Sequence, residues 1–426
     1  MKIAFYTLGC KTNQYETQAL ERLFLERGHE VVAFSDFADV YIVNTCTVTA
    51  LADKKSRNAA RRCRKINPNA TLILCGCYAQ IEPTQAKALC NADYVVGTSD
   101  KRAVLALAEG GGPDRVTDLW HGPLPAFEAL PAGGLAGRTR ALLKIQDGCQ
   151  NFCSYCLIPF ARGPSRSMPL PDAIFETKRL VKDGYHEIVL TGIEISEYGL
   201  DLPEKLTLID LIETICCAAP EVRVRLGSLE PRTVTEEFAV RCAALPNLCP
   251  HFHLSLQSGC NRTLAAMNRR YDTVRYAQSC DILRQHFPGC AITADLIVGF
   301  PGESESDFAE SLAFVRACRL ARVHVFPYSR RKGTRAYSLP GQLTTDEKER
   351  RSAEATSFCK ALQLDYLDSL IGKTLPVLFE RMREGGYTGH SPEYVEVWVS
   401  GSDLHNQTRD VRILVREGEL LKGVMV

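Results

Sequence analysis

The chain has 426 residues, of which 45% are hydrophobic and 24% are charged, and a formal net charge of +1. This composition is that of an ordinary globular protein of roughly three domains, and it excludes a disordered or strongly basic chain. Any contact with nucleic acid must therefore come from local patches. The N-terminus lacks a basic segment leading into a long apolar run, and no apolar run reaches the ~18 residues of a membrane span. We therefore expect a cytoplasmic protein without a membrane anchor, in which clustered cysteines indicate metal or redox chemistry.

Residues 1–108 show alternating strand and helix patterns. The strand-like segments are residues 2–7, 40–45, 71–75 and 94–96, and the helical ones are 14–27, 50–66 and 83–90. Such alternation predicts a small parallel sheet wrapped by helices, as in a flavodoxin-like α/β domain. Ligands of such domains bind beyond the carboxyl ends of the strands.

Three of these strand ends carry cysteine: Cys10, Cys46 and the pair Cys75 and Cys77. Because parallel strands end at one edge of the sheet, three of these thiols can meet and bind a metal cluster. The alternative is a set of independent buried thiols, since free cysteine is among the most buried residue types. Spacing does not decide between Cys75, at the end of an apolar run, and Cys77, after the turn glycine Gly76.

Residues 109–137 are rich in glycine and proline, which break any periodicity. This segment is predicted to be a linker between two domains.

A second cysteine group, Cys149, Cys153 and Cys156, follows an apolar run. The spacing C-x3-C-x2-C suits a loop that holds a 4Fe-4S cluster by three thiolates and leaves one iron open for chemistry. Chance spacing is one alternative in a chain with 18 cysteines. A structural zinc site is another, but it requires a fourth ligand, and no His or Cys knuckle follows nearby.

Residues 138–368 form the predicted central domain. Strand-like runs recur at residues 142–146, 187–191, 223–227, 252–256, 292–298 and 323–327, with helical stretches such as 171–183, 233–244 and 304–318 between them. Six such units predict a partial (β/α)6 barrel that is open on one side for a large substrate. Function is then expected on the loops after the strands.

Residues 369–426 change character, with alternating segments at 375–380, 394–399 and 410–415 and glycines between them. This pattern predicts a small antiparallel β-barrel. From Ile371 onward the chain has seven Lys or Arg against eight Asp or Glu, so the barrel is not basic overall. It is either an RNA-binding module or mainly a packing module.

Taken together, these motifs resemble the radical S-adenosylmethionine methylthiotransferase family over nearly the whole chain. The N-terminal motifs are TLGCK at 7–11, NTCTV at 44–48 and GCYAQ at 76–80. The barrel motifs are LTGIE at 190–194, SLEP at 228–231, HLSLQSG at 253–259, DLIVGFPGE at 295–303, and FPYS with GTRA at 326–336. GYTGHS at 386–391 resembles the TRAM domain, an RNA-binding module.

The resemblance implies two 4Fe-4S clusters. Cys149, Cys153 and Cys156 would hold the cluster that binds S-adenosylmethionine, and Cys10, Cys46 and Cys77 an auxiliary cluster, leaving Cys75 as a spare thiol. The predicted cofactor contacts are Thr191 and Gly192 at the methionine end, Ser228 and Glu230 at the ribose, and Tyr155 at adenine. Each also has a plain structural alternative, such as a turn, a cap or core packing. No residue is expected to do acid–base work, because the cofactors carry the chemistry.

The family adds a methylthio group to tRNA adenosine or to a ribosomal-protein aspartate. In it a reducing electron donor, a sulfur source and a second S-adenosylmethionine take part. The segment QDGC at 146–149 and the short segment ARGPSRS at 161–167 most resemble the branch that acts on C2 of N6-threonylcarbamoyladenosine beside the tRNA anticodon. The alternatives are methylthiolation of N6-isopentenyladenosine and a non-catalytic iron–sulfur RNA-binding protein.

A threonylcarbamoyl group carries a carboxylate, so this branch is expected to place a cation near the reacting adenine. The arginine candidates on loops at the open end of the barrel are Arg162, Arg166, Arg232 and Arg335. We favour Arg162 and Arg166, because they lie in the segment that differs between branches. Glu194, where the isopentenyl branch tends to have an amide, is the remaining predicted substrate contact.

Overall fold

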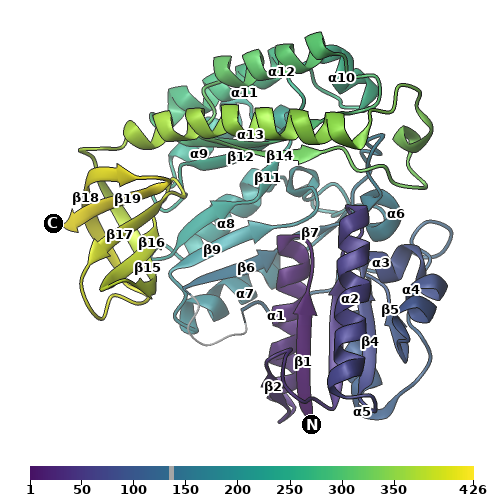
Figure 1. Ribbon diagram of the computed structural model, residues 1–426. Helices are drawn as coiled ribbons and strands as arrows, with labels where there is room; N and C mark the ends of the chain where they lie inside the picture. The colour runs from purple at the N-terminus through teal and green to yellow at the C-terminus, as the bar shows by residue number, and fades with distance from the viewer. Residues whose placement is uncertain (134–138) are drawn as a thin grey trace.

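The computed structural model describes residues 1–133 and 139–426, which form three lobes (Figure 1). An N-terminal α/β domain and a small C-terminal β-barrel both pack against a larger central domain. The predicted boundary between linker and central domain, at residues 137 and 138, lies outside the described residues. None of the described helices is long and apolar enough to cross a membrane.

The N-terminal domain is a five-stranded parallel sheet in the order β2-β1-β3-β4-β5. This is the flavodoxin-like order, as predicted. The strands are β1 (Lys2–Thr7), β2 (Glu30–Val32), β3 (Val40–Thr45), β4 (Thr71–Gly76) and β5 (Tyr94–Val96). The helices are α1 (Lys11–Glu26), α2 (Ala50–Ile66), α3 (Cys77–Ile81), α4 (Pro83–Cys90) and α5 (Ala103–Gly110). Every residue of β3 is buried, because it is the central strand and helices cover both faces of the sheet.

After α5 the described residues 111–133 form no regular element beyond one isolated bridge, from Arg115 to Val96. The segment rests on both domains that it joins. The Tyr15 hydroxyl of α1 donates to the Leu130 carbonyl (2.5 Å), and the Trp120 indole N–H donates to the Pro159 carbonyl (3.0 Å) in the central domain.

The central domain is an open barrel whose parallel strands follow one another in chain order. One sheet holds β6 (Arg140–Lys144), β9 (Glu187–Thr191) and β10 (Arg223–Leu226), and the other holds β11 (Ser228–Leu229), β12 (His251–Gln257), β13 (Ala291–Val298) and β14 (Arg322–Pro327). Only Gly227 separates β10 from β11, so the two sheets make six barrel positions. This confirms the predicted partial β/α barrel.

Along β6, residues of the hydrophobic core alternate with residues that line a cavity. Ala141 and Leu143 of β6 belong to the main hydrophobic core, whereas Arg140 and Leu142, which alternate with them, line a cavity. The helices of the domain are α6 (Ile158–Arg162), α7 (Leu170–Lys182), α8 (Leu208–Ala218), α9 (Glu236–Ala243), α10 (Asn261–Ala266), α11 (Thr273–His286), α12 (Glu305–Ala317) and α13 (Thr345–Asp368).

The long helix α13 was not among the elements predicted from the sequence. The Thr344 side chain caps it by accepting from the Glu347 N–H, and Asp346 and Glu347 complement the positive end of its dipole. It packs along β14 and leads to the C-terminal barrel (Figure 1).

The C-terminal barrel closes in the order β15-β16-β17-β19-β18. Its strands are β15 (Thr374–Arg383), β16 (Gly386–His390), β17 (Glu396–Ser400), β18 (Thr408–Glu417) and β19 (Leu420–Met425). The prediction of a wholly antiparallel barrel was wrong in one pairing, because β19 closes the barrel by pairing parallel to β17. A Cβ added at Gly389 would lie 2.2 Å from the Leu378 carbonyl oxygen, so glycine is required where β16 meets β15.

Candidate active site

Cys10, Cys46 and Cys77 meet at the carboxyl edge of the N-terminal sheet. Cys10 follows β1, Cys46 follows β3 and Cys77 opens α3 after β4, and these three strands are neighbours with level ends. Gly9, at φ +104°, lets the chain pass close by, since a Cβ there would lie 3.1 Å from Cys46 Sγ. Burial raises the pKa of Cys46 to about 12, and the neighbouring Cys77 thiol is the second contribution to this increase.

The structure separates Cys75 from this N-terminal triad. Cys75 is fully buried on β4 and packs in an apolar cluster with Ile3, Leu20 and Phe24. Cys77 instead lies beside Arg162 and Cys10, which both act on its thiol. The ligand assignment to Cys77 stays a prediction, with the geometry in its favour.

The barrel triad Cys149, Cys153 and Cys156 lies on a loop that is fixed at several points. The Cys149 N–H donates to the Gly163 carbonyl (3.0 Å) and the Ser154 N–H to the Met267 carbonyl (2.9 Å). The short strands β7 (Gln146–Asp147) and β8 (Arg166–Ser167) pair antiparallel and fix the flanks of the loop and of the segment that follows it.

Arg269, which the sequence did not single out, contacts this triad directly. Its Nη1 lies 3.0 Å from Cys153 Sγ, and the Ile158 N–H lies 3.4 Å from Cys156 Sγ. Donors aimed at cysteine sulfurs are typical of the surroundings of iron–sulfur clusters.

The two triads are close enough for the Cys77 thiol to act on Cys156 across the domain interface. Burial, and then the Cys153 thiol, raises the pKa of Cys156 to about 12, and Cys77 from the other triad also contributes.

Between the triads lies a buried ion-pair network. Its ion pairs join four cations to two carboxylates: Lys101, Lys144, Arg162 and Arg166 with Glu16 and Asp147. Arg162 is its centre, with Nη1 2.5 Å from Glu16 Oε1 and 3.2 Å from Asp147 Oδ2. Burial alone would raise the pKa of Asp147, but Arg162 holds it well below its usual range.

The charge balance of this network fits a bound cluster in the N-terminal triad. Four buried cations are ion-paired with two carboxylates, and the half-buried Glu128 also acts on Lys101 and Lys144, so the cations still exceed the carboxylates by one, and uncompensated buried charge is costly. A thiolate-bound cluster beside Arg162 would supply the missing negative charge. The residues of this site therefore suit an anionic iron–sulfur group.

The structure does not agree with our preference for Arg162 and Arg166 as substrate contacts. Arg162 is 0% exposed and Arg166 4%. The guanidinium of Arg162 is held by Glu16, Asp147 and the Asn13 side chain, and Arg166 donates to the Arg162 carbonyl. Arg162 therefore joins α1 to Asp147, which lies just before the cysteine loop, and Arg166 packs beside it, so neither is available to an incoming substrate. The partner Glu16 lies 146 residues away in sequence, where no local pattern reveals it.

The other predicted contacts fall into two groups. Thr191, Gly192 and Ser228 line one cavity of about 830 Å³ together with Cys10 of the N-terminal triad. Glu230 is buried, and its carboxylate accepts from the Arg232 side chain (2.9 Å), so these two predicted residues pair with each other.

The remaining predicted residues surround the site. Tyr155 packs against the apolar cluster of Met267, Phe300 and Tyr328, and Arg335 is exposed after β14. Glu194 lies beside the cysteine loop, where its carboxylate is 3.4 Å from the Asn151 amide nitrogen. Burial raises the pKa of Glu194 to about 7.

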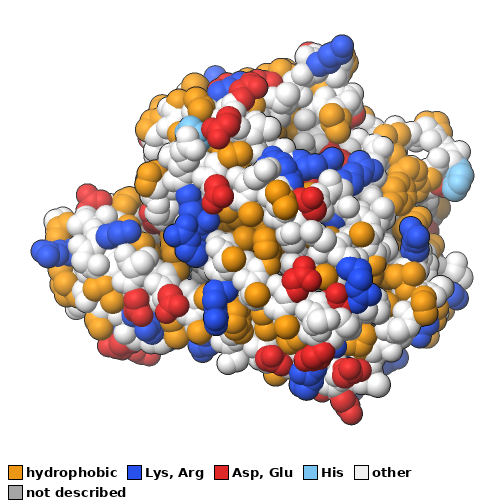
Figure 2. Space-filling model, turned by 90° about the horizontal axis from the view of Figure 1, so that it is seen from above, with side chains coloured by type: hydrophobic (Ala, Val, Ile, Leu, Met, Phe, Trp, Pro, Cys, Tyr) orange, Lys and Arg blue, Asp and Glu red, His pale blue; other side chains and the backbone are white. Residues whose placement is uncertain are grey.

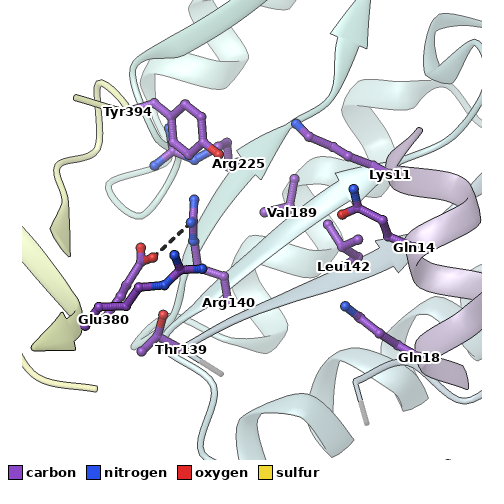
Figure 3. Close-up of a pocket in the computed structure, with 11 residues that line it drawn as sticks. Lys11, Gln14, Gln18, Thr139, Arg140, Leu142, Val189, Arg225, Glu380 and Tyr394 are labelled. Atoms are coloured by element: carbon purple, nitrogen blue, oxygen red, sulfur yellow. Dashed lines mark hydrogen bonds and ion pairs between the residues drawn. The ribbon is translucent and has the colours of Figure 1, made fainter. Parts of the chain in front are cut away.

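A second cavity of about 330 Å³ shares Lys11, Gln14 and Tyr394 with the larger one. It lies between α1, the barrel strands and the C-terminal barrel, so all three domains contribute walls (Figure 3). Sequence reasoning missed its charged residues Arg140 and Arg225. Their signal was an arginine that alternates with apolar residues, Ala141 in β6 and Val224 in β10.

Two cysteine triads at strand ends, one of them on an open β/α barrel, define an iron–sulfur enzyme of the radical S-adenosylmethionine class. Comparison with known families agrees with this class. The radical SAM superfamily matches residues 143–315, and the family described as uncharacterized protein family UPF0004 matches residues 2–97.

Similarity to full-length proteins defines the family. The chain is 36% identical over 438 residues to the threonylcarbamoyladenosine tRNA methylthiotransferase MtaB of Bacillus subtilis, covering 99% of this chain and 97% of that protein. It is 34% identical to the tRNA-2-methylthio-N(6)-dimethylallyladenosine synthase of Moorella thermoacetica, with the same coverage. The chain therefore belongs to the radical SAM methylthiotransferase family.

A solved structure shares the fold. The radical S-adenosylmethionine methyltransferase TsrM of Kitasatospora setae matches with a TM-score of 0.60 at 15% identity, covering 79% of this chain and 73% of that one.

Proposed function

We propose that this methylthiotransferase acts on tRNA and adds a methylthio group to C2 of N6-threonylcarbamoyladenosine beside the anticodon. Relatives with this activity in their names, from Bacillus subtilis and Aquifex aeolicus, are each 36% identical. The dimethylallyladenosine enzyme is nearly as similar, so identity alone does not choose the substrate.

The observation that favours the threonylcarbamoyl substrate over the isopentenyl one is the number of polar side chains that line the smaller cavity. The smaller cavity is lined by Lys11, Gln14, Gln18, Arg140 and Arg225. An isopentenyl group is a hydrocarbon and would bury its surface best against apolar side chains. A threonylcarbamoyl group carries amide, hydroxyl and carboxylate groups, which need polar partners when buried.

We propose that each triad holds a 4Fe-4S cluster, the N-terminal one being auxiliary. When bound, the clusters and S-adenosylmethionine supply the one-electron reduction, the hydrogen abstraction, the sulfur and the methyl group. Thr191, Gly192, Ser228, Glu230 and Tyr155 would bind and orient the cofactor at the top of the barrel. Lys11 and Gln14 of α1 line both cavities together with barrel residues, and the N-terminal domain would limit the access of water there. A reducing electron donor and a sulfur source are needed as partners.

RNA binding must rest on local patches. Figure 2 shows Lys and Arg side chains in separate groups, interspersed with acidic and apolar ones, in keeping with the net charge of +1. We propose that the C-terminal barrel, on which Arg409 and Arg412 are exposed, contributes to RNA binding. Action on tRNA implies a cytoplasmic protein.

Nucleoside mass spectrometry of tRNA from cells that lack this protein tests the proposal. We expect 2-methylthio-N6-threonylcarbamoyladenosine to disappear, its unthiolated precursor to accumulate, and methylthio-isopentenyladenosine to stay unchanged. Loss of the isopentenyl product instead would establish the alternative substrate. Reconstituted protein with S-adenosylmethionine and dithionite should yield 5′-deoxyadenosine, which a non-catalytic RNA-binding protein would not.

A further inference from the structure

The smaller cavity carries a surplus of positive charge. Four cations and one carboxylate line it: Lys11, Arg140, Arg225 and Arg381 with Glu380. Figure 3 shows Lys11 reaching from α1 toward Arg225, with Arg140 and Glu380 paired on the opposite side. A cleft lined by one sign of charge concentrates ions of the opposite sign.

Two of these cations already have partners within the protein. Arg225 is almost fully buried and donates to both oxygens of Glu187 (2.7 and 3.2 Å) and to the Pro392 carbonyl (2.6 Å). Arg140 lies 3.0 Å from Glu380. These two arginines hold the C-terminal barrel against the central domain.

Lys11 and Arg381 differ from them. Among the described residues, neither has a hydrogen bond or an ion pair, and both are solvent accessible. They come from different domains, α1 and β15, and they line the same cavity. An anion that enters from solvent can therefore approach either side chain without displacing an existing partner.

The cavity lies close to the predicted reaction site. Val189 in its wall stands two residues before Thr191 on β9, which is about 7 Å along the strand. Lys11 directly follows Cys10. A base held near Thr191 and Ser228 would thus reach the cavity with a substituent of only a few covalent bonds.

We propose that Lys11 and Arg381 bind the carboxylate of the threonylcarbamoyl group and so distinguish this substrate from an isopentenyl one. This inference rests on the proposed function. A charge-assisted contact suits a carboxylate, and the neighbouring Gln14 and Gln18 amides offer hydrogen bonds to its polar chain. A tRNA phosphate is the other anion that fits, but every tRNA would present it.

The test compares two synthetic anticodon stem-loop RNAs, one with the free carboxylate and one with its neutral methyl ester. Reconstituted holoenzyme should bind the acid about tenfold more tightly than the ester. The double variant Lys11→Met, Arg381→Gln should lose this preference, so that the ratio of the two Kd values approaches one.

Three further variants separate loss of the carboxylate contact from unspecific effects of the substitutions. Lys11→Arg keeps the charge and should keep the preference, and Arg383→Gln, two residues along β15 and outside the cavity, should do the same. Because Lys11 adjoins Cys10, iron content is measured for every variant. Arg381→Gln alone, on another domain, should lower the preference severalfold with normal iron.

The outcomes separate this inference from the proposed function. Equal binding of acid and ester by wild-type protein that still methylthiolates threonylcarbamoyl RNA overturns the carboxylate site alone. An equal loss on acid, ester and unmodified RNA in the double variant assigns the cavity to phosphate and also overturns it. Activity on isopentenyl RNA without activity on threonylcarbamoyl RNA overturns the proposed function itself.

Discussion

Arg269 places a guanidinium nitrogen 3.0 Å from Cys153 Sγ, close enough to influence a cluster held by that sulfur. A neighbouring cation stabilises the more negative, reduced state of a cluster. We therefore expect Arg269→Met to shift the midpoint potential of the barrel cluster to a more negative value, as measured by a redox titration monitored by electron paramagnetic resonance. Arg270→Gln is the matched control, since Arg270 is exposed and, within the described part of the chain, donates to the Gln150 carbonyl alone (3.4 Å). An unchanged potential in the Arg269 variant, with full iron content, would show that this contact only positions the loop.

Also at the scale of single residues, Glu194 is expected to make the folding stability depend on pH. Burial, partly offset by Arg269, raises the pKa of Glu194 to about 7, whereas an unfolded glutamate titrates near 4.3. The folded state therefore holds a proton that the unfolded state has lost, and stability falls as pH rises between these values. Glu194→Gln should match the wild-type melting temperature at low pH and exceed it at pH 8.

The exposed Glu221→Gln is the control for this measurement. It should leave the difference in melting temperature between the two pH values unchanged. A Glu194→Gln variant that follows the wild-type pH dependence would show that other groups cause it.

At the scale of elements, Arg225 is one of the arginines that join the central domain to the C-terminal barrel. Arg225 binds Glu187 and donates to the Ser391 and Pro392 carbonyls, and its guanidinium lies 4.6 Å from the Tyr394 ring centroid. Arg225→Met would leave Glu187 buried with fewer partners, a loss worth about 3 kcal/mol for such pairs. We expect a lower midpoint of denaturant unfolding and faster proteolysis between α13 and β15. Arg412→Gln, at an exposed position of β18, should change neither; equal effects of both substitutions would argue against a special role of Arg225.

Elements with a strong pattern were predictable from the sequence. The limits of β9 match the predicted run of residues 187–191, because its residues are all buried and its ends carry turn residues. The three-residue edge strand β2 has too few residues to show a period, and it is held by β1 rather than by its own sequence. Helix α13 buries only Arg351, Ala355, Cys359 and Leu367, which makes a weak apolar stripe.

The residues of the site likewise divide into those that the sequence predicted and those that it did not. Cysteines at strand ends and the loop motifs point to chemistry through local spacing, and the structure places the two triads at the expected edges. Arg162 was misjudged because its partners Glu16 and Asp147 come from different domains, and only the packed interface brings them together. Lys11 and Arg381 likewise share a cavity only after three domains have packed.

At the scale of the whole molecule, the buried network between the triads ties the two cluster sites into one unit. Lys101 and Lys144 both lie 3.6 Å from Glu16, and all three side chains have at most 1% exposure. The domain interface beside the N-terminal triad is thus held by buried ion pairs. Its surplus of cations makes the stability of the interface depend on the negative charge that the N-terminal triad holds.

This dependence predicts different consequences for the loss of each triad. Replacing Cys10, Cys46 and Cys77 by Ala should leave about four irons on the barrel triad and preserve formation of 5′-deoxyadenosine while methylthiolation stops. Replacing Cys149, Cys153 and Cys156 should also leave about four irons but abolish 5′-deoxyadenosine. The N-terminal variant should have the lower melting temperature, because it leaves the cations around Arg162 uncompensated.

Cys75→Ala and the exposed Cys217→Ala are controls that should keep both clusters and the product. An N-terminal variant that keeps its fold and its four irons but forms no 5′-deoxyadenosine would contradict this division of roles, and equal melting temperatures would contradict the charge argument.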